Sequence, residues 1–600
     1  MILTDYSILQ LTDPDSFASL VLLNSKWRRI SQQAHLYAYH LSRCPSYATS
    51  HPPILSTSIN DDALPNLRRL FAREVKRNLF EAYLRPKKTT IKLISNSISS
   101  SSAPGGEGMQ FNPSPRGHHL LAYNSSRIYV LDVRGPGLAV KRELKILRRP
   151  VSTCIVDDGS FLAVLSTDMQ VDLYDLNQTP PRRKQSLILD NTPRAMALSP
   201  CGRVLAAAYE GGIEVSSLNP GALATERRAV KCDGVDALAF SLDGTQLLGT
   251  TTASTAPNTV ILTAPYYDPG GQLANDDISA LWTTSILFPN TSRDCSHAVL
   301  LQESGSMEAS WAFTYDRSFE TFRAVRIDDL RNGTTYFTGP VPTTASPGPL
   351  LPCTLPAASY QGDLVSAGFH GKEIWIYGVP EDLEAMPEAH HPVDSSTLPG
   401  LHRRSSGHSV RSPSRMQEAN GCRVPQWQIL CDKLRNTFVS GRIIAESSGV
   451  SNVKWVSGFG SSSLQERLII ASKGIVPHRQ ITEEEGIDFV DGGRITLLDF
   501  DCSLQNGEDE EVIIEVGTKE PEALEEELRD MDTEVAIVRR RTVAQRRGNR
   551  SSMVRAATTI NRQAEALLRA PAAEEDMEDP LIPRPRGRAQ HYAELRLLPL

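Results

Sequence analysis

The sequence lacks the marks of a secreted, membrane-spanning or zinc-binding protein. Its nine cysteines are scattered over 600 residues without a Cys-x-x-Cys pair, which argues against a disulfide or zinc framework and fits a reducing compartment. No apolar run approaches the ~20 residues of a membrane span. Asp5, Asp13 and Asp15 interrupt any apolar stretch that a signal peptide would need. We therefore expect a cytoplasmic or nuclear location, or both.

The sequence also has little net charge and no recognisable catalytic motif. Its net charge of −7 is too small an excess to indicate nucleic acid or a membrane as the partner. It contains no Gly-rich phosphate loop, no Gly-x-Ser-x-Gly elbow and no His-Glu-x-x-His pair. The neighbours in His118-His119 and His390-His391 would point to opposite sides of a strand and would rarely share a metal. We expect no catalytic residues, no cofactor and no metal site.

What the sequence does contain is a repeated β-meander. Residues 195–218 are typical of three strands joined by two tight turns. The first turn is Ser199-Pro200-Cys201-Gly202, in which proline presets φ and glycine tolerates a positive φ. The second, Glu210-Gly211-Gly212, is a strong hairpin signal between two apolar runs. One meander of this size cannot bury its faces alone, so further copies are expected.

The same layout recurs at a regular interval. Equivalent positions are occupied, 44, 43 and 42 residues apart, by Phe111, Ile155, Leu198 and Phe240. That period matches a four-stranded propeller blade, and a closed ring of blades leaves only short, protected sheet edges. Later β segments at 296–327, 363–377 and 452–500 bring the number of candidate blades to seven.

These units resemble WD repeats. Tyr129-Val-Leu-Asp132 and Val171-Asp-Leu-Tyr174 stand where a member of that family ends its third strand, although the family's Gly-His and Trp-Asp pairs are absent. The repeat period and the number of candidate blades predict a mainly β fold, a seven-bladed β-propeller, which we place at residues 89–505. An all-β sandwich is the alternative architecture.

Residues 1–50 carry a second informative pattern. Asp13-Pro14 is typical of a helix entry. Apolar side chains then recur at helical spacing as Phe17, Leu20, Val21, Leu23, Trp27 and Ile30. The order Leu11-x-Asp-Pro-x-x-Phe-x-x-Leu-x-Leu-Leu-Asn-x-x-Trp-Arg-Arg-Ile, followed by Leu36-Tyr37, resembles the later two-thirds of an F-box.

The F-box resemblance covers about 40 residues and is incomplete. Trp27-Arg28 matches the family, Tyr37 stands for its usual tryptophan, and Met1 to Tyr6 are similar to the tail of its first helix rather than to its Leu-Pro opening. The motif is therefore N-terminally incomplete or degenerate. The resemblance implies that the helices bind a Skp-type adaptor, with Leu20, Leu23, Trp27 and Ile30 as apolar anchors. The alternative is a helical cap that packs against the propeller.

Three further segments complete the domain plan. Residues 51–88 hold an amphipathic helix over 64–85 whose basic side chains we interpret as a solvated face. Residues 387–417 are read as a disordered insertion between blades, in which Ser406 and Ser412 are candidate phosphosites. Residues 506–600 are predicted to be a charged, mostly disordered tail, with an acidic part able to form a helix and a following basic run.

Together these patterns predict a non-catalytic adaptor. The F-box resemblance implies a substrate-recognition subunit of a cullin-type ubiquitin ligase, whose propeller binds a substrate protein. Two alternatives stay open: a propeller scaffold without a ligase role, and a propeller enzyme whose site no motif reveals.

Overall fold

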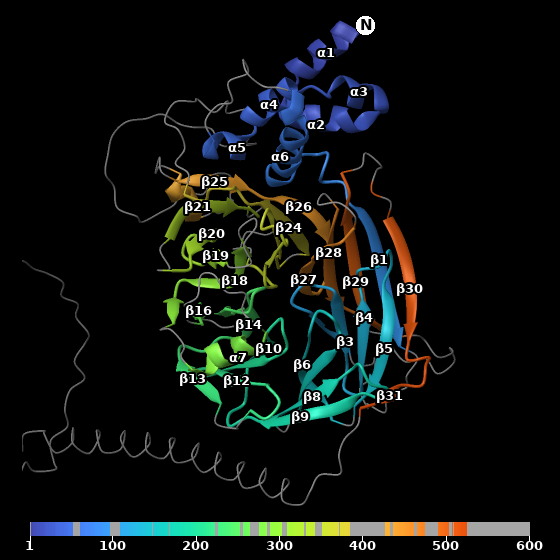
Figure 1. Cartoon of the computed structure of the whole chain (residues 1–600), viewed down its shortest axis with the longest axis vertical. Coiled ribbons are helices and arrows are strands. Elements are labelled where there is room, and N and C mark those ends of the chain that lie inside the picture. The colour runs from blue at the N-terminus through green and yellow to red at the C-terminus, as the bar shows by residue number, and fades with distance from the viewer. Residues whose placement is uncertain are drawn as a thin grey trace, which may run out of the picture. The chain divides into compact units, whose positions relative to one another are not determined.

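The protein is a seven-bladed β-propeller preceded by a group of helices (Figure 1). The chain consists of two units, Met1–Arg529 and Asp530–Leu600, and the second lies outside the described residues. The computed structural model describes residues 2–51, 61–95, 108–146, 148–166, 169–222, 226–252, 256–264, 275–284, 289–302, 309–328, 332–341, 351–370, 372–384, 426–431, 436–460, 465–474, 490–502, 507 and 509–524.

Seven separate antiparallel meanders form the ring, which confirms the predicted fold class and excludes a two-sheet sandwich. Blades 1 to 3 follow the regular repeat: β2(Gln110–Pro113), β3(His119–Tyr123), β4(Arg127–Asp132), β5(Ala139–Lys145); β6(Pro150–Ile155), β7(Phe161–Ser166), β8(Gln170–Asp175), β9(Arg182–Ile188); β10(Ala195–Leu198), β11(Val204–Tyr209), β12(Gly212–Ser217), β13(Arg227–Lys231). Blade 4 contains β14(Ala237–Phe240), β15(Gln246–Thr250), β16(Thr259–Thr263), the unpredicted helix α7(Asn275–Thr284) and β17(Asn290–Ser292).

The remaining blades are less regular. Blade 5 is β18(Cys295–Gln302), β19(Ala309–Asp316), β20(Thr321–Arg326) and β21(Asn332–Thr338), with β25(Thr437–Ser440) added in parallel. Blade 6 is β22(Ala357–Ala358), β23(Leu364–Gly368), β24(Glu373–Gly378) and β26(Arg442–Glu446), and a short 3-10 helix, η3(Gln426–Leu430), precedes β25. Blade 7 is β27(Val450–Val456), β28(Glu466–Lys473), β29(Val490–Phe500) and the N-terminal strand β1(Lys87–Ser95).

One turn recurs in the blades and explains the sequence period. In blade 3 the backbone N–H of Val204 donates to Ser199 Oγ at 3.0 Å, while Gly202 has a φ of 69° that favours glycine. The same serine contact is made by Ser114, Ser241 and Ser359, each three residues before a positive-φ glycine. The repeated serine–glycine turn therefore fixes the start of the second strand in four blades.

The ring is closed by strands from both ends of the propeller sequence. β1 pairs antiparallel with β29 and parallel with β30(Asp509–Val516), so it lies between them. The chain then crosses to blade 1, where β31(Glu522–Ala523) pairs with β5. Figure 1 shows orange β30 alongside blue β1. We call residues 509–524 the C-terminal clasp.

The clasp corrects two predictions made for the tail. The tail is predicted to start at residue 506 and to be mostly disordered, with an acidic part able to form a helix, whereas residues 509–516 form a strand of blade 7. Val512, Ile514 and Val516 occupy alternate positions of β30 and pack against the hydrophobic cluster that includes Ile91 and Leu93 of β1. The surrounding carboxylates form exposed ion pairs with Lys87, Lys88 and Lys92 of β1.

The predicted insertion is flanked by strands of two different blades. Residues 387–417, including Ser406 and Ser412, lie outside the described residues. In the sequence the insertion follows β24 of blade 6 and precedes β25, which pairs with β21 of blade 5.

The N-terminal segment folds as short helices. They are α1(Ile2–Leu11), α2(Pro14–Leu23), α3(Ser25–Ile30), α4(Ala34–Ser42), α5(Pro45–Ser50), the 3-10 helix η2(Asp61–Ala63) and α6(Leu64–Arg77). The helix predicted to extend to residue 85 ends at Arg77, because Leu79 adopts a positive φ of 50° that an α-helix cannot continue. No helix of the described residues is long and apolar enough to cross a membrane.

Candidate functional site

The predicted adaptor-binding residues lie on α2 and α3, whose ends are set by two caps. Asp13 Oδ1 accepts the backbone N–H groups of Asp15 and Ser16 at 3.0 Å each, and Pro14 occupies the first turn of α2. Asn24 ends α2 in an extended conformation and caps α3 by accepting the N–H of Trp27 at 3.1 Å. The apolar side chains that recur at helical spacing from Phe17 to Ile30 therefore belong to two short helices, α2 and α3.

The structure separates the four predicted anchors by exposure. Leu23 is 57% exposed, whereas Leu20, Trp27 and Ile30 are half-buried and pack against the hydrophobic cluster beneath. All four belong to the same pair of short helices. Leu23 is therefore the predicted anchor that is most available to a partner.

Further exposed apolar side chains lie on the N-terminal helices α1, α2 and α4. Eleven large apolar residues are exposed in the described part of the chain, and five of them lie within the first 40 residues. Sequence reasoning had not selected the other four, which are Ile8 at 44%, Leu11 at 83%, Leu22 at 40% and Tyr39 at 41%. Such a concentration of exposed apolar side chains is typical of an interaction surface.

A closed core supports these helices from below. Phe17 is fully buried, stacks on His40 with ring centroids 4.0 Å apart, and meets Phe71 of α6 edge-on at 5.3 Å. His40 Nε2 lies 2.8 Å from the carbonyl oxygen of Leu9, which joins α4 to α1. Burial lowers the pKa of His40 to about 4, so its ring is neutral at pH 7.

Helix α6 attaches this helical group to the ring through buried charges. Arg77 Nε lies 2.9 Å from Asp363 Oδ1, and its Nη1 lies 2.9 Å from Glu381 Oε2 and 3.2 Å from Glu74 Oε1. Lys76 Nζ lies 3.0 Å from Glu466 Oε2. The interpretation of α6 as a solvated basic face is wrong for these two residues, which are 7% and 1% exposed, because acidic side chains of the ring pair with them.

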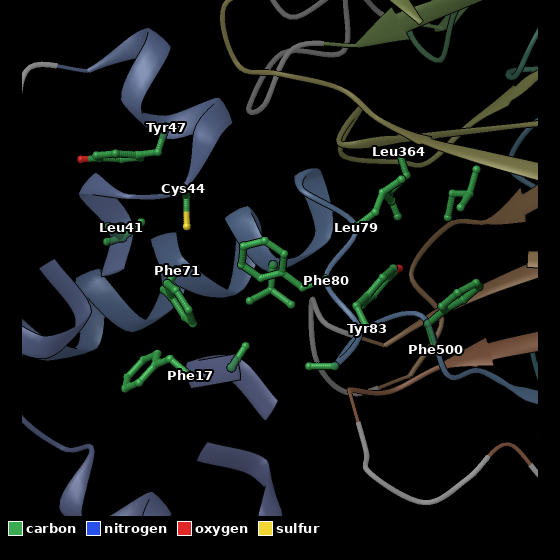
Figure 2. Close-up of a cluster of buried hydrophobic side chains, with 14 of the residues drawn as sticks. Phe17, Leu41, Cys44, Tyr47, Phe71, Leu79, Phe80, Tyr83, Leu364 and Phe500 are labelled. Atoms are coloured by element: carbon green, nitrogen blue, oxygen red, sulfur yellow. The ribbon is translucent and has the colours of Figure 1, made fainter. Parts of the chain in front are cut away.

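Apolar contacts run continuously from the helices into blades 6 and 7 (Figure 2). Tyr83 stacks on Phe500 with ring centroids 4.9 Å apart, and its hydroxyl donates to Glu466 Oε2 at 2.6 Å. Phe17 and Phe71 lie at the helical end of the same cluster, and Leu364 lies at the blade 6 end. One core therefore holds helices and ring together.

Strand topology identifies the face that carries the helices. Because neighbouring strands of a blade are antiparallel, the turns after first and third strands share one face of the ring. Asp363 and Glu466 stand at the start of second strands, and Glu381 follows a third strand, so α6 contacts this face. We call it the helix-bearing face.

A family model described as "Domain of unknown function (DUF7165)" matches residues 86–527, which is most of the chain. The chain belongs to this family. The limits of the DUF7165 match nearly coincide with the start of β1 and the end of the clasp, so the matched region is the ring together with both closing segments. The helices α1 to α6 precede it.

Other comparisons add little to the DUF7165 assignment. No curated protein matches the sequence. The β-propeller domain of Cps50 (Swd1) from Myceliophteria thermophila is 16% identical over 46% of this chain and 84% of its own, with a TM-score of 0.32. Hsv2 from Kluyveromyces lactis is 8% identical over 61% and 94%, with a TM-score of 0.37. Likenesses this weak carry no argument, and the fold rests on the strand pairing above.

On the opposite face, the DUF7165 ring has a cleft of about 810 Å³ between blades 3 and 4. Its walls come from turns between second and third strands and from connections between blades, including Glu210, Lys231 and Asn258. The described residues contain no group of three or more His, Cys, Asp or Glu placed to hold a metal ion. A propeller of this kind is consistent with a protein-interaction scaffold.

Proposed function

We propose that the protein is a substrate-recognition adaptor of a cullin-type ubiquitin ligase. In this proposal α1 to α3 bind a Skp-type adaptor and the propeller binds a substrate protein. The chain contributes no chemistry of its own. It raises the effective concentration of a substrate lysine near a charged conjugating enzyme.

The observation that carries the proposal is the set of exposed apolar side chains on α1 and α2. A helical cap would bury its apolar stripe against the ring, yet Leu11, Leu22 and Leu23 remain exposed while Phe17 below them is closed over. Each such side chain, if a partner buried it fully, would contribute on the order of 1.5–3 kcal/mol. These helices also carry the residues that resemble an F-box.

The attachment of the helices to the ring supports the same proposal. A ligase adaptor acts by position, and a flexible connection would lower the effective concentration of the substrate. Here Arg77, Lys76 and Tyr83 fasten α6 to blades 6 and 7 through buried polar contacts. The opposite face of the ring, including the cleft between blades 3 and 4, is left for a substrate.

Leu23 is the residue at which the proposal is tested most cleanly. We expect Leu23→Asp to abolish pull-down of a purified Skp-type adaptor while the melting temperature stays within about 2 °C of wild type, because a surface substitution changes stability little. Ile513→Asp is the matched control, since Ile513 is 60% exposed on β30, away from the helices. Adaptor recovery that is equal for both variants would reject the proposal.

The alternative is a propeller scaffold whose helices have no ligase partner. Trp27→Ala does not separate the two functions well, because Trp27 is half-buried against the core as well as partly accessible. The scaffold alternative predicts that wild-type protein recovers no Skp-type adaptor.

A further inference from the structure

A second binding feature lies where the helices meet the ring. A cleft of about 880 Å³ opens between α2 and α6, and Gln361 and Cys502 of the ring form part of its wall. Its apolar lining includes Val21, Leu22 and Leu70. Leu22 is 40% exposed, so an apolar side chain is presented at the cleft.

The charge of the cleft is one-sided. Of the described residues that line it, four are cationic and none is acidic, although the chain as a whole has a net charge of −7. Two of the four cations are neutralised by the ring: Lys76 pairs with Glu466, and Arg73 Nε lies 3.7 Å from Asp363 Oδ2.

The other two cations are Arg68 and Arg69. No carboxylate of the described residues forms an ion pair with either of them, and Arg69 is exposed. Both extend from α6 at the same cleft as Leu70. These two unpaired guanidinium groups beside apolar side chains favour an acidic ligand, because a guanidinium group can bind a carboxylate with two parallel hydrogen bonds.

We propose that this cleft binds an acidic segment of a partner protein that inserts at least one bulky apolar side chain. The carboxylates of the segment pair with Arg68 and Arg69, and the apolar side chain packs against Leu22 and Leu70. Nucleic acid fits the charge but not the apolar lining, so the combination favours a protein segment. The site goes beyond the proposed adaptor contact, which centres on Leu23.

The proposal is tested with a labelled probe peptide on the full-length protein. The probe is fluorescein-Glu-Glu-Leu-Leu-Glu-Glu, and its matched peptides replace either every Glu by Gln or both Leu by Ser. We expect saturable binding of the probe by fluorescence anisotropy at low salt and markedly weaker binding of both matched peptides. Raising the salt concentration weakens binding further, because salt screens exposed charges.

Variants assign the binding to the cleft. We expect Arg68→Glu/Arg69→Glu to weaken probe binding roughly tenfold, which corresponds to about 1.4 kcal/mol, and Leu22→Asp to weaken it as well. Arg85→Glu is the control, since Arg85 is 43% exposed and lies after the end of α6. If the double variant loses stability, Arg68→Gln/Arg69→Gln replaces it.

The outcomes also separate this inference from the proposed function. Leu23→Asp is expected to lose the Skp-type adaptor and keep the probe, whereas the arginine variant is expected to lose the probe. Absence of saturable binding to wild type would overturn the inference. So would equal binding of the Leu-to-Ser peptide, or displacement by single-stranded RNA as effective as displacement by unlabelled probe, because either result indicates a general polyanion site.

Discussion

Arg77 and Asp363 lie 286 residues apart in the sequence, yet Arg77 Nε and Asp363 Oδ1 are 2.9 Å apart in the folded protein. Asp363 is 1% exposed, and Arg77 is 7% exposed. This pair joins the last turn of α6 to the start of the second strand of blade 6. The Arg77–Asp363 pair therefore attaches the helical segment to the ring.

The first prediction concerns this pair. Asp363→Ala should lower the free energy of unfolding by up to about 3–5 kcal/mol, because it removes the most buried partner of Arg77 and leaves only Glu74 and the half-exposed Glu381 to compensate a buried charge. Chemical denaturation measures the change. Arg85→Ala is the control, since the exposed Arg85–Glu81 pair, 3.8 Å apart, should contribute no more than about 1 kcal/mol. Equal effects of the two variants would show that the Arg77–Asp363 pair does not anchor α6.

The second prediction concerns the closest approach of α6 to the ring. A Cβ atom at Gly378 would overlap the carbonyl oxygen of Arg77, which is backbone and cannot rotate away. Gly378→Ala should therefore displace α6 and increase protease cleavage between α6 and β1. Gly137→Ala, whose Cβ would meet nothing within 4 Å, is the matched control. An unchanged cleavage pattern in the Gly378 variant would contradict the docking described here.

The third prediction is a pH dependence set by His40. Burial lowers its folded-state pKa to about 4, below the unfolded value of about 6.5. The folded state therefore binds fewer protons in this window, and stability present above pH 6.5 is lost as the pH falls toward 4. His297 has a pKa lowered to about 4 for the same reason and acts in the ring.

Replacing His40 isolates its share of that dependence. His40→Gln retains a side-chain donor for the Leu9 carbonyl but cannot titrate. We expect the stability of this variant, measured by urea unfolding, to fall less steeply between pH 6.5 and pH 4 than that of the wild type. Identical slopes would show that His40 does not titrate with the lowered pKa.

The fourth prediction concerns the C-terminal clasp. Truncation after residue 529 should leave the ring unchanged, whereas truncation after residue 505 removes Val516, which is fully buried against blade 7 and blade 1 residues. Loss of one such side chain costs about 1.5–3 kcal/mol. Hydrogen exchange of the β1 amides should accelerate only in the shorter protein. Equal exchange in both proteins would mean that the clasp does not hold β1.

Much of the fold could be predicted because one local turn repeats. Phe111, Ile155, Leu198 and Phe240 lie in the first strands of blades 1 to 4, so the interval between them is the blade itself. The fourth occurrence of the turn, Ser359-Tyr-Gln-Gly-Asp-Leu364, is visible in the sequence and places blade 6 more firmly.

Other features could not be predicted because their causes lie far away in the sequence. Lys76 and Arg77 are read as solvated on any helical wheel, and only the fold brings them to Glu466 and Asp363. The apolar residues of β30 stand among acidic side chains in the sequence. The strand that pairs with β30 is β1, which lies at the other end of the propeller sequence. At the candidate site, helical spacing identified the apolar side chains of α2 and α3 but not which of them the hydrophobic core would bury.

The ligase-adaptor function is tested most directly by size-exclusion chromatography with light scattering on the full-length protein mixed with a purified Skp-type adaptor. We expect a single 1:1 complex of the adaptor with the 66.0 kDa chain, no complex for Leu23→Asp, and an unchanged complex for Ile513→Asp. Separate elution of the wild-type protein and the adaptor would contradict the ligase-adaptor function.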